Sequence, residues 1–158
     1  MGLSSGACLS SLGHSVVCLD IDESKISMLR SGRIPIVETG LAELVTAGIA
    51  SHSLKFTTEI SESIPQADVV FLCLPTPQDD DGSADLSYVE KAVGDIRASL
   101  KSGAIVVNKS TVPVGTAVRV KEILQRGDVH VVSNPEFLRQ GTAVHDFLNP
   151  SRVVIGGD

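Results

Sequence analysis

Five short apolar runs, each rich in β-branched residues, recur along the chain and constrain its fold more than any other feature. Apolar residues follow one another in these runs instead of alternating with polar ones. That pattern is typical of strands in a parallel sheet whose two faces are both covered. We therefore predict buried strands at residues 15–20, 68–74, 104–108, 129–133 and 152–156.

Segments with the helical spacing of apolar residues lie between several of these runs. They are residues 23–31, 85–100 and 116–125, the last with Val118, Val120, Ile123 and Leu124 on one stripe. The alternation of strand and helix predicts an α/β fold with a doubly wound, mostly parallel sheet. Stretches rich in Pro, Gly or acidic residues predict loops at 32–40 and 75–85. We expect residues 1–158 to form one domain.

The composition argues against several classes of partner. The net charge of −6 argues against nucleic acid or an anionic membrane surface. An aromatic content of 3% without Trp argues against a base-stacking surface. No apolar run approaches the about 20 residues of a membrane span, and the start of the chain lacks the basic region of a signal peptide. We therefore expect a soluble, cytoplasmic protein without a nucleic-acid or membrane partner.

The cysteines and histidines give no sign of a disulfide framework or a metal site. Cys8, Cys18 and Cys73 lie in apolar runs without CxxC spacing, which predicts buried free thiols in a reducing compartment. The four histidines lack metal-ligand spacing. The acidic loop 75–85 also fails the calcium-loop pattern, because no register satisfies both the glycine and the terminal carboxylates. We expect no metal.

A carboxylate follows the first apolar run at Asp20. Ligands of doubly wound sheets bind at the carboxyl ends of the strands, where an acid can accept both hydroxyls of an adenosine ribose. Such an acid would repel a 2′-phosphate and so favour NAD over NADP. Asp20 is also well placed to cap a helix beginning at Asp22. The residues alone leave both interpretations open.

Two turns that carry hydroxyl groups follow the next strands. Thr76 is flanked by two prolines, which fix the backbone and so orient the hydroxyl. Ser110 and Thr111 follow the run at 104–108 in a similar way. A rigid turn explains either motif alone, but their recurrence at successive strand ends favours a ligand site.

A second candidate acid, Glu136, follows the run at 129–133. A carboxylate set against Phe137 in a partly apolar cleft would have a raised pKa and could act as a general acid or base. A helix cap is the alternative, and the motif judged alone favours the cap.

Taken in order, these segments resemble the UDP-glucose 6-dehydrogenases. The matching stretches are 6–9, 13–22, IPIVETGL (34–41), FTTEISE (56–62), ADVVFLCLPTP, DGSADLSYV, NKSTVPVGT, SNPEFLRQG and PSRVVIG. They cover nearly the whole chain, and STVPVGT followed by NPEFLR is the most specific part. The related GDP-mannose and UDP-N-acetylmannosamine dehydrogenases share this frame, but STVPVG and PSRVVIG fit the glucose enzyme better.

The resemblance implies the Rossmann-like NAD-binding domain of an enzyme that oxidises the C6 hydroxyl of UDP-glucose to a carboxylate. The product is UDP-glucuronate, and the reaction uses two NAD⁺ and a cysteine-bound intermediate. Carried over by position, Asp20 and Lys25 would contact the adenosine ribose. Thr76 and Thr111 would line the nicotinamide side. The full-length enzyme could be a homo-oligomer.

The same resemblance implies which residues would act in catalysis and which would bind the substrate and the cofactor. Glu136 would be the acid/base, and Thr111 would help to hold the catalytic water. The substrate segment would comprise Glu136, Phe137, Leu138, Arg139 and Gln140. The cofactor-binding residues would be Gly2, Asp20, Lys25, Thr76, Ser110, Thr111 and Gln140.

Three departures from the family pattern weigh against activity of this chain alone. Gly2 matches only the third glycine of the Gly-x-Gly-x-x-Gly turn, so the first strand and two glycines are missing. Gln140 replaces an acid, and the chain ends at Asp158, before the substrate domain and the nucleophilic cysteine. We expect no turnover of UDP-glucose by this chain. A non-catalytic remnant that binds a nucleotide weakly, or acts as an interaction module, is the alternative.

Overall fold

The computed structural model describes residues 1–79 and 82–157, which form two compact units. The first unit comprises Met1–Ser63 and Phe137–Arg152, and the second comprises Ile64–Glu136 and Val153–Asp158. The chain therefore leaves the second unit after Glu136, contributes one more helix to the first, and returns at Val153.

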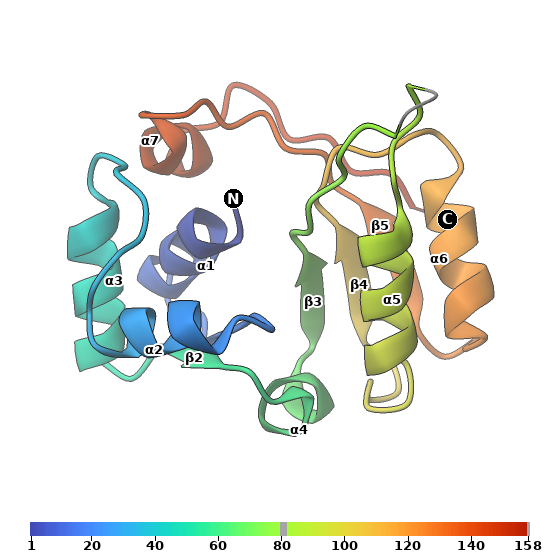
Figure 1. The fold of residues 1–158 in the computed structure, drawn as a ribbon, viewed down its shortest axis with the longest axis horizontal. Helices are drawn as coiled ribbons and strands as arrows, with labels where there is room; N and C mark the ends of the chain where they lie inside the picture. The colour runs from blue at the N-terminus through green and yellow to red at the C-terminus, as the bar shows by residue number, and fades with distance from the viewer. Residues whose placement is uncertain (80–81, 158) are drawn as a thin grey trace. The chain divides into compact units, whose positions relative to one another are not determined.

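The first unit contains a two-stranded parallel sheet. Strand β1 (Val16–Leu19) pairs with β2 (Leu54–Thr57), with Val16 opposite Leu54 and Leu19 opposite Thr57. The helices of this unit are α1 (Gly2–Ser11), α2 (Glu23–Arg30), α3 (Leu41–Ala50), α4 (Ile60–Ser63) and α7 (Ala143–Leu148). Figure 1 shows α7 beside α1 although the two helices are far apart in the sequence.

The core of the first unit joins both strands to four of its helices. Its buried residues are Ala7, Cys8, Ile26, Leu29, Leu41, Val45, Leu54, Phe56 and Val144. Helix α1 packs closely on the sheet because Gly6 has no side chain. A Cβ placed on Gly6 would lie 2.7 Å from the sulfur of Cys18 on β1. Val144 brings α7 into the same core, so the segment after Glu136 is anchored by apolar contacts.

The second unit contains a three-stranded parallel sheet in the order β3-β4-β5. The strands are β3 (Val69–Leu72), β4 (Ile105–Asn108) and β5 (His130–Ser133). A short 3-10 helix (Ile64–Gln66) precedes β3, and helices α5 (Ser87–Ile96) and α6 (Thr116–Leu124) connect the strands. Buried residues of this unit include Val89, Val93, Ile96, Val106, Val120 and Leu124. Parallel strands put their carboxyl ends at one edge of a sheet, so the residues after β3, β4 and β5 come together.

Most predicted elements are confirmed. Four of the five apolar runs form parallel strands, and α2, α5 and α6 occupy the predicted helical segments. The segments 32–40, 75–79 and 82–85 form no helix or strand, and residues 80 and 81 of the predicted loop 75–85 lie outside the described residues. The α/β doubly wound class is therefore correct.

Two predictions about the fold are wrong. The run 152–156 forms no strand: Gly156 makes a single antiparallel bridge to Ser133, while Val153 and Ile155 are 63% and 71% exposed. Val118, predicted to lie on the apolar stripe of α6, is 61% exposed. Apolar character alone did not reveal that the run 152–156 pairs only at Gly156, or that Val118 lies off the buried side of α6, which carries Val120 and Leu124.

No helix within the described ranges 1–79 and 82–157 is long and apolar enough to cross a membrane.

Candidate functional site

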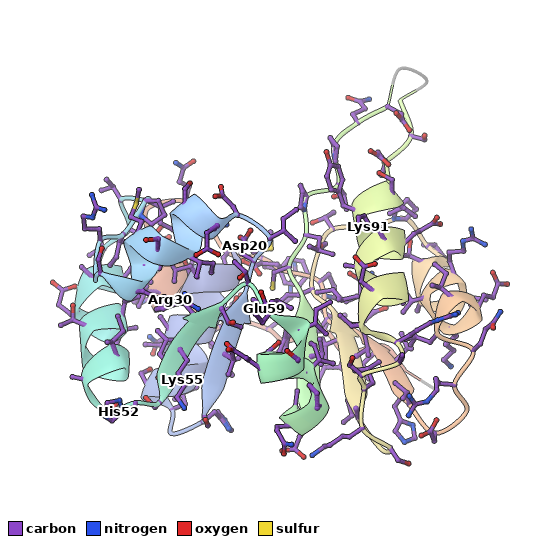
Figure 2. All side chains as sticks on the ribbon, turned by 60° about the horizontal axis from the view of Figure 1, so that its bottom comes forward. Asp20, Arg30, His52, Lys55, Glu59 and Lys91 are labelled. Carbon is purple, nitrogen blue, oxygen red and sulfur yellow. The ribbon has the colours of Figure 1, made fainter. Side chains whose placement is uncertain are left out.

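Asp20 lies immediately after β1 in the first unit, where its amide extends the parallel pairing by donating to the carbonyl of Thr57. Its Oδ1 accepts the amide of Asp22 at 3.1 Å, and its Oδ2 forms an ion pair with the ammonium group of Lys25 on α2. The Asp20 side chain is 31% exposed, so its carboxylate can accept further bonds from a ligand (Figure 2). The structure therefore brings two predicted ribose-binding residues, Asp20 and Lys25, together.

The helix-cap interpretation of Asp20 is wrong, because Asp22 caps α2. The Oδ1 atom of Asp22 accepts the amides of Ser24 and Lys25 at 3.0 and 3.1 Å. The backbone bond from Lys25, followed by the bond from the Ser24 hydroxyl, lowers the pKa of Asp22. Asp20 is thus not needed to begin this helix.

The beginning of α1 fits the diphosphate of NAD. Gly2 is the first residue of the helix, no side chain caps its amides, and its first turn contains no acidic residue. Unpaired amides at a helix N-terminus are suitable donors to phosphate oxygens. The Ser5 hydroxyl in the next turn is 2% exposed and has no hydrogen-bond partner among the described residues. The first unit thus carries donors for a diphosphate and a carboxylate for a ribose.

The hydroxyl-bearing turns of the second unit are in contact. The Thr76 hydroxyl donates to the carbonyl of Thr111 at 3.0 Å, which joins the turns after β3 and β4. Ser110 is 2% exposed, and its Oγ accepts the amide of Leu74 at 2.9 Å. The Ser110 hydroxyl also donates to the carbonyl oxygen of Leu74 at 2.8 Å. Ser110 thus braces the two turns, while Thr111 is exposed.

Glu136 is buried in the second unit beside a lysine. Its side chain is 5% exposed, and its Oε2 lies 3.7 Å from the Nζ of Lys109, whose side chain is 9% exposed. The same Nζ donates to Oδ1 of Asn134 at 3.3 Å. Oε2 has no hydrogen-bond partner among the described residues. Desolvation raises the pKa of Glu136, and the charge of Lys109 partly opposes this rise.

The raised pKa of Glu136 agrees with the sequence expectation, but its cause differs. Desolvation by burial is the largest cause of the raised pKa. The Phe137 ring is half exposed, and its centroid lies 4.6 Å from the guanidinium carbon of Arg152. The cap alternative for Glu136 is wrong, because α7 begins only at Ala143 and its N-cap is Thr142. A protonatable carboxylate at this edge of the sheet can exchange protons with a ligand.

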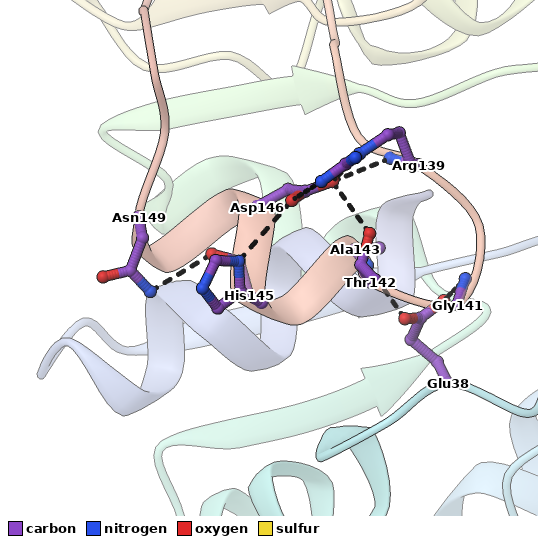
Figure 3. Close-up of polar contacts among 8 residues, drawn as sticks. All are labelled: Glu38, Arg139, Gly141, Thr142, Ala143, His145, Asp146 and Asn149. Atoms are coloured by element: carbon purple, nitrogen blue, oxygen red, sulfur yellow. Dashed lines mark hydrogen bonds and ion pairs between the residues drawn. The ribbon is translucent and has the colours of Figure 1, made fainter.

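The remaining predicted substrate residues lie in the first unit, in the segment before α7. Leu138 is half-buried and Gln140 is exposed. Arg139 donates through Nε and Nη2 to the two carboxylate oxygens of Asp146, at 3.0 and 2.9 Å (Figure 3). These bonds lower the pKa of Asp146. The Arg139 guanidinium is therefore already held by a carboxylate of its own segment.

Two residues at these places were not singled out from the sequence. Lys109 was noted only as part of the NKSTVPVGT motif, yet it is buried beside Glu136. Glu38 was noted only within IPIVETGL, yet it bonds to two amides of the segment that contains α7. A lysine directly after an apolar run predicted to be a buried strand was a usable signal for Lys109. No local signal points from Glu38 to a segment more than a hundred residues away.

No disulfide joins the three cysteines, all of which lie in the described residues, and only Cys8 is fully buried. Cys18 and Cys73 are half-buried, so the prediction of three buried thiols is wrong for two of them. Desolvation raises the pKa of both Cys8 and Cys73 to about 11. These two sulfurs are therefore thiols at neutral pH, which does not fit the thiolate that a nucleophilic cysteine requires.

A pocket of about 490 Å³ lies on β2 in the first unit. Its polar lining residues are Arg30, His52, Lys55, Thr57 and Glu62, and the others are apolar. Figure 2 labels Arg30, His52 and Lys55. None of the predicted site residues lines this pocket. Within the part of the chain that the structure describes, no cluster of three His, Cys, Asp or Glu residues could hold a metal ion.

Known proteins resemble this chain in both sequence and structure. Residues 1–158 match the NAD binding domain of the UDP-glucose/GDP-mannose dehydrogenase family. A UDP-glucose 6-dehydrogenase from Rhizobium meliloti (strain 1021) is 50% identical over 163 residues, a match covering 100% of this chain and 37% of that protein. The UDP-glucose dehydrogenase of Pyrobaculum islandicum is 40% identical with a TM-score of 0.89, covering 99% of this chain and 38% of its own.

A ternary complex of GDP-mannose dehydrogenase from Pseudomonas aeruginosa is 34% identical with a TM-score of 0.92, covering 99% of this chain and 38% of that one. The chain thus spans little more than a third of the length of these relatives. With the full-length match to the family and the Rossmann-type fold, NAD is the cofactor of this domain. The chain belongs to the UDP-glucose/GDP-mannose dehydrogenase family, whose NAD-binding domain it represents.

Proposed function

We propose that this chain is the NAD-binding part of a UDP-glucose 6-dehydrogenase, which oxidises UDP-glucose to UDP-glucuronate with two NAD⁺. The observation that carries the proposal is the buried pair of Glu136 and Lys109, in the same unit as the joined Thr76 and Thr111 turns. The 50% identity to the Rhizobium meliloti UDP-glucose 6-dehydrogenase supports the choice of substrate.

The first unit binds the adenosine end of the cofactor in this proposal. The Asp20 carboxylate accepts the ribose hydroxyls, and Lys25 holds that carboxylate in place through their ion pair. Gly2 and the uncapped amides of α1 donate to the diphosphate. A 2′-phosphate would meet the Asp20 charge directly, so NAD is preferred over NADP.

The second unit supplies the groups for proton transfer. When bound, NAD⁺ accepts a hydride from C6 of the sugar. Glu136 takes up or returns the accompanying proton at its carboxylate, for which a pKa raised by burial is suited. The charge of Lys109 lowers the pKa of Glu136 against the rise from burial and so favours the carboxylate form that acts as a base. Thr111 presents an exposed hydroxyl that holds the catalytic water, and Thr76 fixes that turn by bonding to its carbonyl.

The substrate segment Glu136 to Gln140 contacts the nucleotide sugar. GDP-mannose and UDP-N-acetylmannosamine are second candidates, because the Pseudomonas aeruginosa GDP-mannose dehydrogenase and the Pyrococcus horikoshii UDP-D-ManNAc dehydrogenase both have a TM-score of 0.92. Backbone similarity of this degree does not distinguish the sugars, whereas sequence identity favours UDP-glucose, at 50% and 40% against 34%.

These 158 residues by themselves do not turn over UDP-glucose in this proposal. The thiols of Cys8 and Cys73 are protonated at neutral pH, and neither serves as the nucleophile of the covalent step. In this proposal the chain binds ligands without completing the oxidation.

Thermal unfolding of the purified chain with NAD⁺ plus UDP-glucose, GDP-mannose or UDP-N-acetylmannosamine tests the proposal. A ligand at a hundredfold excess over its dissociation constant adds about 2.7 kcal/mol of stability. We expect UDP-glucose to raise the midpoint most, with no NADH formed above a heat-inactivated control. A larger shift with GDP-mannose would overturn the substrate, and no shift with any nucleotide would favour the non-catalytic remnant. NADH formation would refute the lack of turnover.

A further inference from the structure

Glu38 bonds through both carboxylate oxygens to the segment that precedes and begins α7. Its Oε2 accepts the amide of Gly141 at 2.9 Å, and its Oε1 accepts the amide of Ala143 at 2.8 Å. Figure 3 shows the carboxylate facing these two amides. The bonds join residues 103 and 105 positions apart within the first unit. They are therefore tertiary contacts and not features of a local turn.

The segment 137–152, which contains α7, is also tied to itself. Arg139 and Thr142 both bond to the carboxylate of Asp146. Near its two ends, the Phe137 ring lies against the guanidinium of Arg152. These contacts shape the segment internally, but none of them fixes it to the rest of the unit.

Apolar packing and Glu38 make that attachment. Val144 is 8% exposed and belongs to the core cluster that also contains Leu41, three residues after Glu38. Packing at Val144 holds α7 itself. The bonds of Glu38 lie closer to the substrate segment, because Gly141 directly follows Gln140. Gly141 has φ +88, a left-handed conformation at which the chain turns sharply into α7.

The side chains of the substrate segment depend on this anchor because packing restrains them little. Phe137 is 49% exposed, the Arg139 side chain is 75% exposed, and Gln140 is exposed. A backbone held at Gly141 limits where these side chains can be presented. A good hydrogen bond needs a donor–acceptor distance within a few tenths of an ångström of about 2.9 Å, so a small displacement of this segment weakens its bonds to a ligand.

We infer that Glu38 is a positioning residue for the nucleotide sugar: its carboxylate holds the amides of Gly141 and Ala143 and thereby places residues 137–140 for substrate binding. This inference rests on the proposed function, since it assigns those residues to the substrate. Glu38 itself contacts neither the sugar nor the cofactor in this account. It lies outside the acid/base and ribose-binding groups.

The experiment compares wild-type protein with Glu38→Gln, Glu38→Ala and the control Glu43→Gln. Glu43 is an exposed acid five residues further on, in α3. Gln keeps one acceptor oxygen and turns an amide group toward the second N–H, whereas Ala removes both acceptors. Amide hydrogen exchange reports on the anchor, and calorimetric affinities for UDP-glucose and NAD⁺ report on function. If Glu38→Ala fails to unfold cooperatively, Glu38→Gln still decides the question.

We expect faster exchange at Gly141 and Ala143 and UDP-glucose affinity about tenfold weaker in Glu38→Gln, the equivalent of one charge-assisted hydrogen bond. The NAD⁺ affinity of Glu38→Gln should remain at the wild-type value, as should the exchange rates and both affinities of the control Glu43→Gln. If Glu38 only stabilised the fold, Glu38→Gln would weaken the binding of UDP-glucose and of NAD⁺ to the same extent, and that result would overturn the inference. Unchanged exchange, or equal UDP-glucose affinity in wild type and Glu38→Gln, would also overturn it. Wild-type protein that binds NAD⁺ but not UDP-glucose would overturn the proposed substrate together with this role.

Discussion

The ammonium group of Lys109 lies 3.7 Å from carboxylate oxygen Oε2 of Glu136, and the two side chains are only 9% and 5% exposed. Burial favours the neutral acid, while the neighbouring cation favours the carboxylate. The two effects oppose each other at Glu136, and burial is the larger. This opposition keeps Glu136 able to exchange its proton, which is what a general acid/base needs.

Replacing Lys109 by Met should raise the pKa of Glu136 further, because it removes the positive charge that opposes the effect of burial. Carbon-13 NMR titration of the Glu136 carboxyl group would measure the change. The folded chain already holds this proton to a higher pH than the unfolded chain does. Folding stability therefore falls as pH rises from the unfolded pKa to the folded pKa, and Lys109→Met should widen that window. Lys109→Arg serves as the control that keeps the charge, and a lower pKa in Lys109→Met would contradict the account.

Replacing Asp20 by Ala should weaken NAD⁺ binding about ten- to a hundredfold, the usual effect of losing hydrogen bonds to a charged group. Asp22→Ala is the matched control, since it removes a carboxylate two residues away that caps α2. It should cost about 1 kcal/mol of stability without changing NAD⁺ affinity. Calorimetric titration and thermal unfolding separate the two effects. Equal loss of affinity in both variants would argue against a ribose contact at Asp20.

Gly6→Ala should destabilise the first unit by about 1–3 kcal/mol, as overpacking of a close contact does. Its Cβ would lie 2.7 Å from the sulfur of Cys18, between α1 and β1. Gly94→Ala in α5 is the control, because no atom lies within 4 Å of its Cβ. That change should be neutral or stabilise by up to about 1 kcal/mol, because Ala favours a helix more than Gly does. Urea unfolding would compare the free energies of unfolding of the two variants. A Gly6→Ala variant as stable as wild type would refute the close packing of α1 on β1.

Asp146→Asn should reduce stability at neutral pH, with the effect disappearing in acid. Hydrogen bonds from Arg139 lower the pKa of Asp146 in the folded chain. A lowered folded pKa stabilises the protein above the unfolded value of about 3.9, and this contribution is lost as pH falls through the folded pKa. The stability difference from wild type, measured by urea unfolding, should therefore shrink steadily below about pH 4. The exposed Asp95 of the Lys91 pair provides a control, Asp95→Asn, with little effect at pH 7. A difference that grows on acidification would reverse the assigned sign.

The strands that could be predicted are those with continuous apolar runs. The runs containing β1, β3, β4 and β5 are long, β-branched and bounded by polar turns. Strand β2 was missed because its four residues, LKFT, alternate in polarity and are too few to establish a period. The run 152–156 was overpredicted because strand formation requires a pairing partner, and only Gly156 has a bridge. Pairing is a tertiary property that composition does not reveal.

The sites show the same division between local and tertiary information. The proximity of Asp20 and Lys25 follows from a strand end and the first turn of the next helix, so position alone predicts it. The contact between Thr76 and Thr111 follows from two successive strand ends. The contacts of Glu38 with Gly141 and Ala143 join segments more than a hundred residues apart. No spacing rule in a single sequence could have predicted them.

Calorimetric titration of the wild-type chain with NAD⁺ and, separately, with NADP⁺ tests the central claim most directly. The account predicts saturable binding of one NAD⁺ per chain and binding of NADP⁺ at least about tenfold weaker, because the Asp20 carboxylate repels the 2′-phosphate. Equal affinity for both cofactors would contradict the role of Asp20. No heat of binding with either cofactor would contradict the assignment of these residues to a working NAD site.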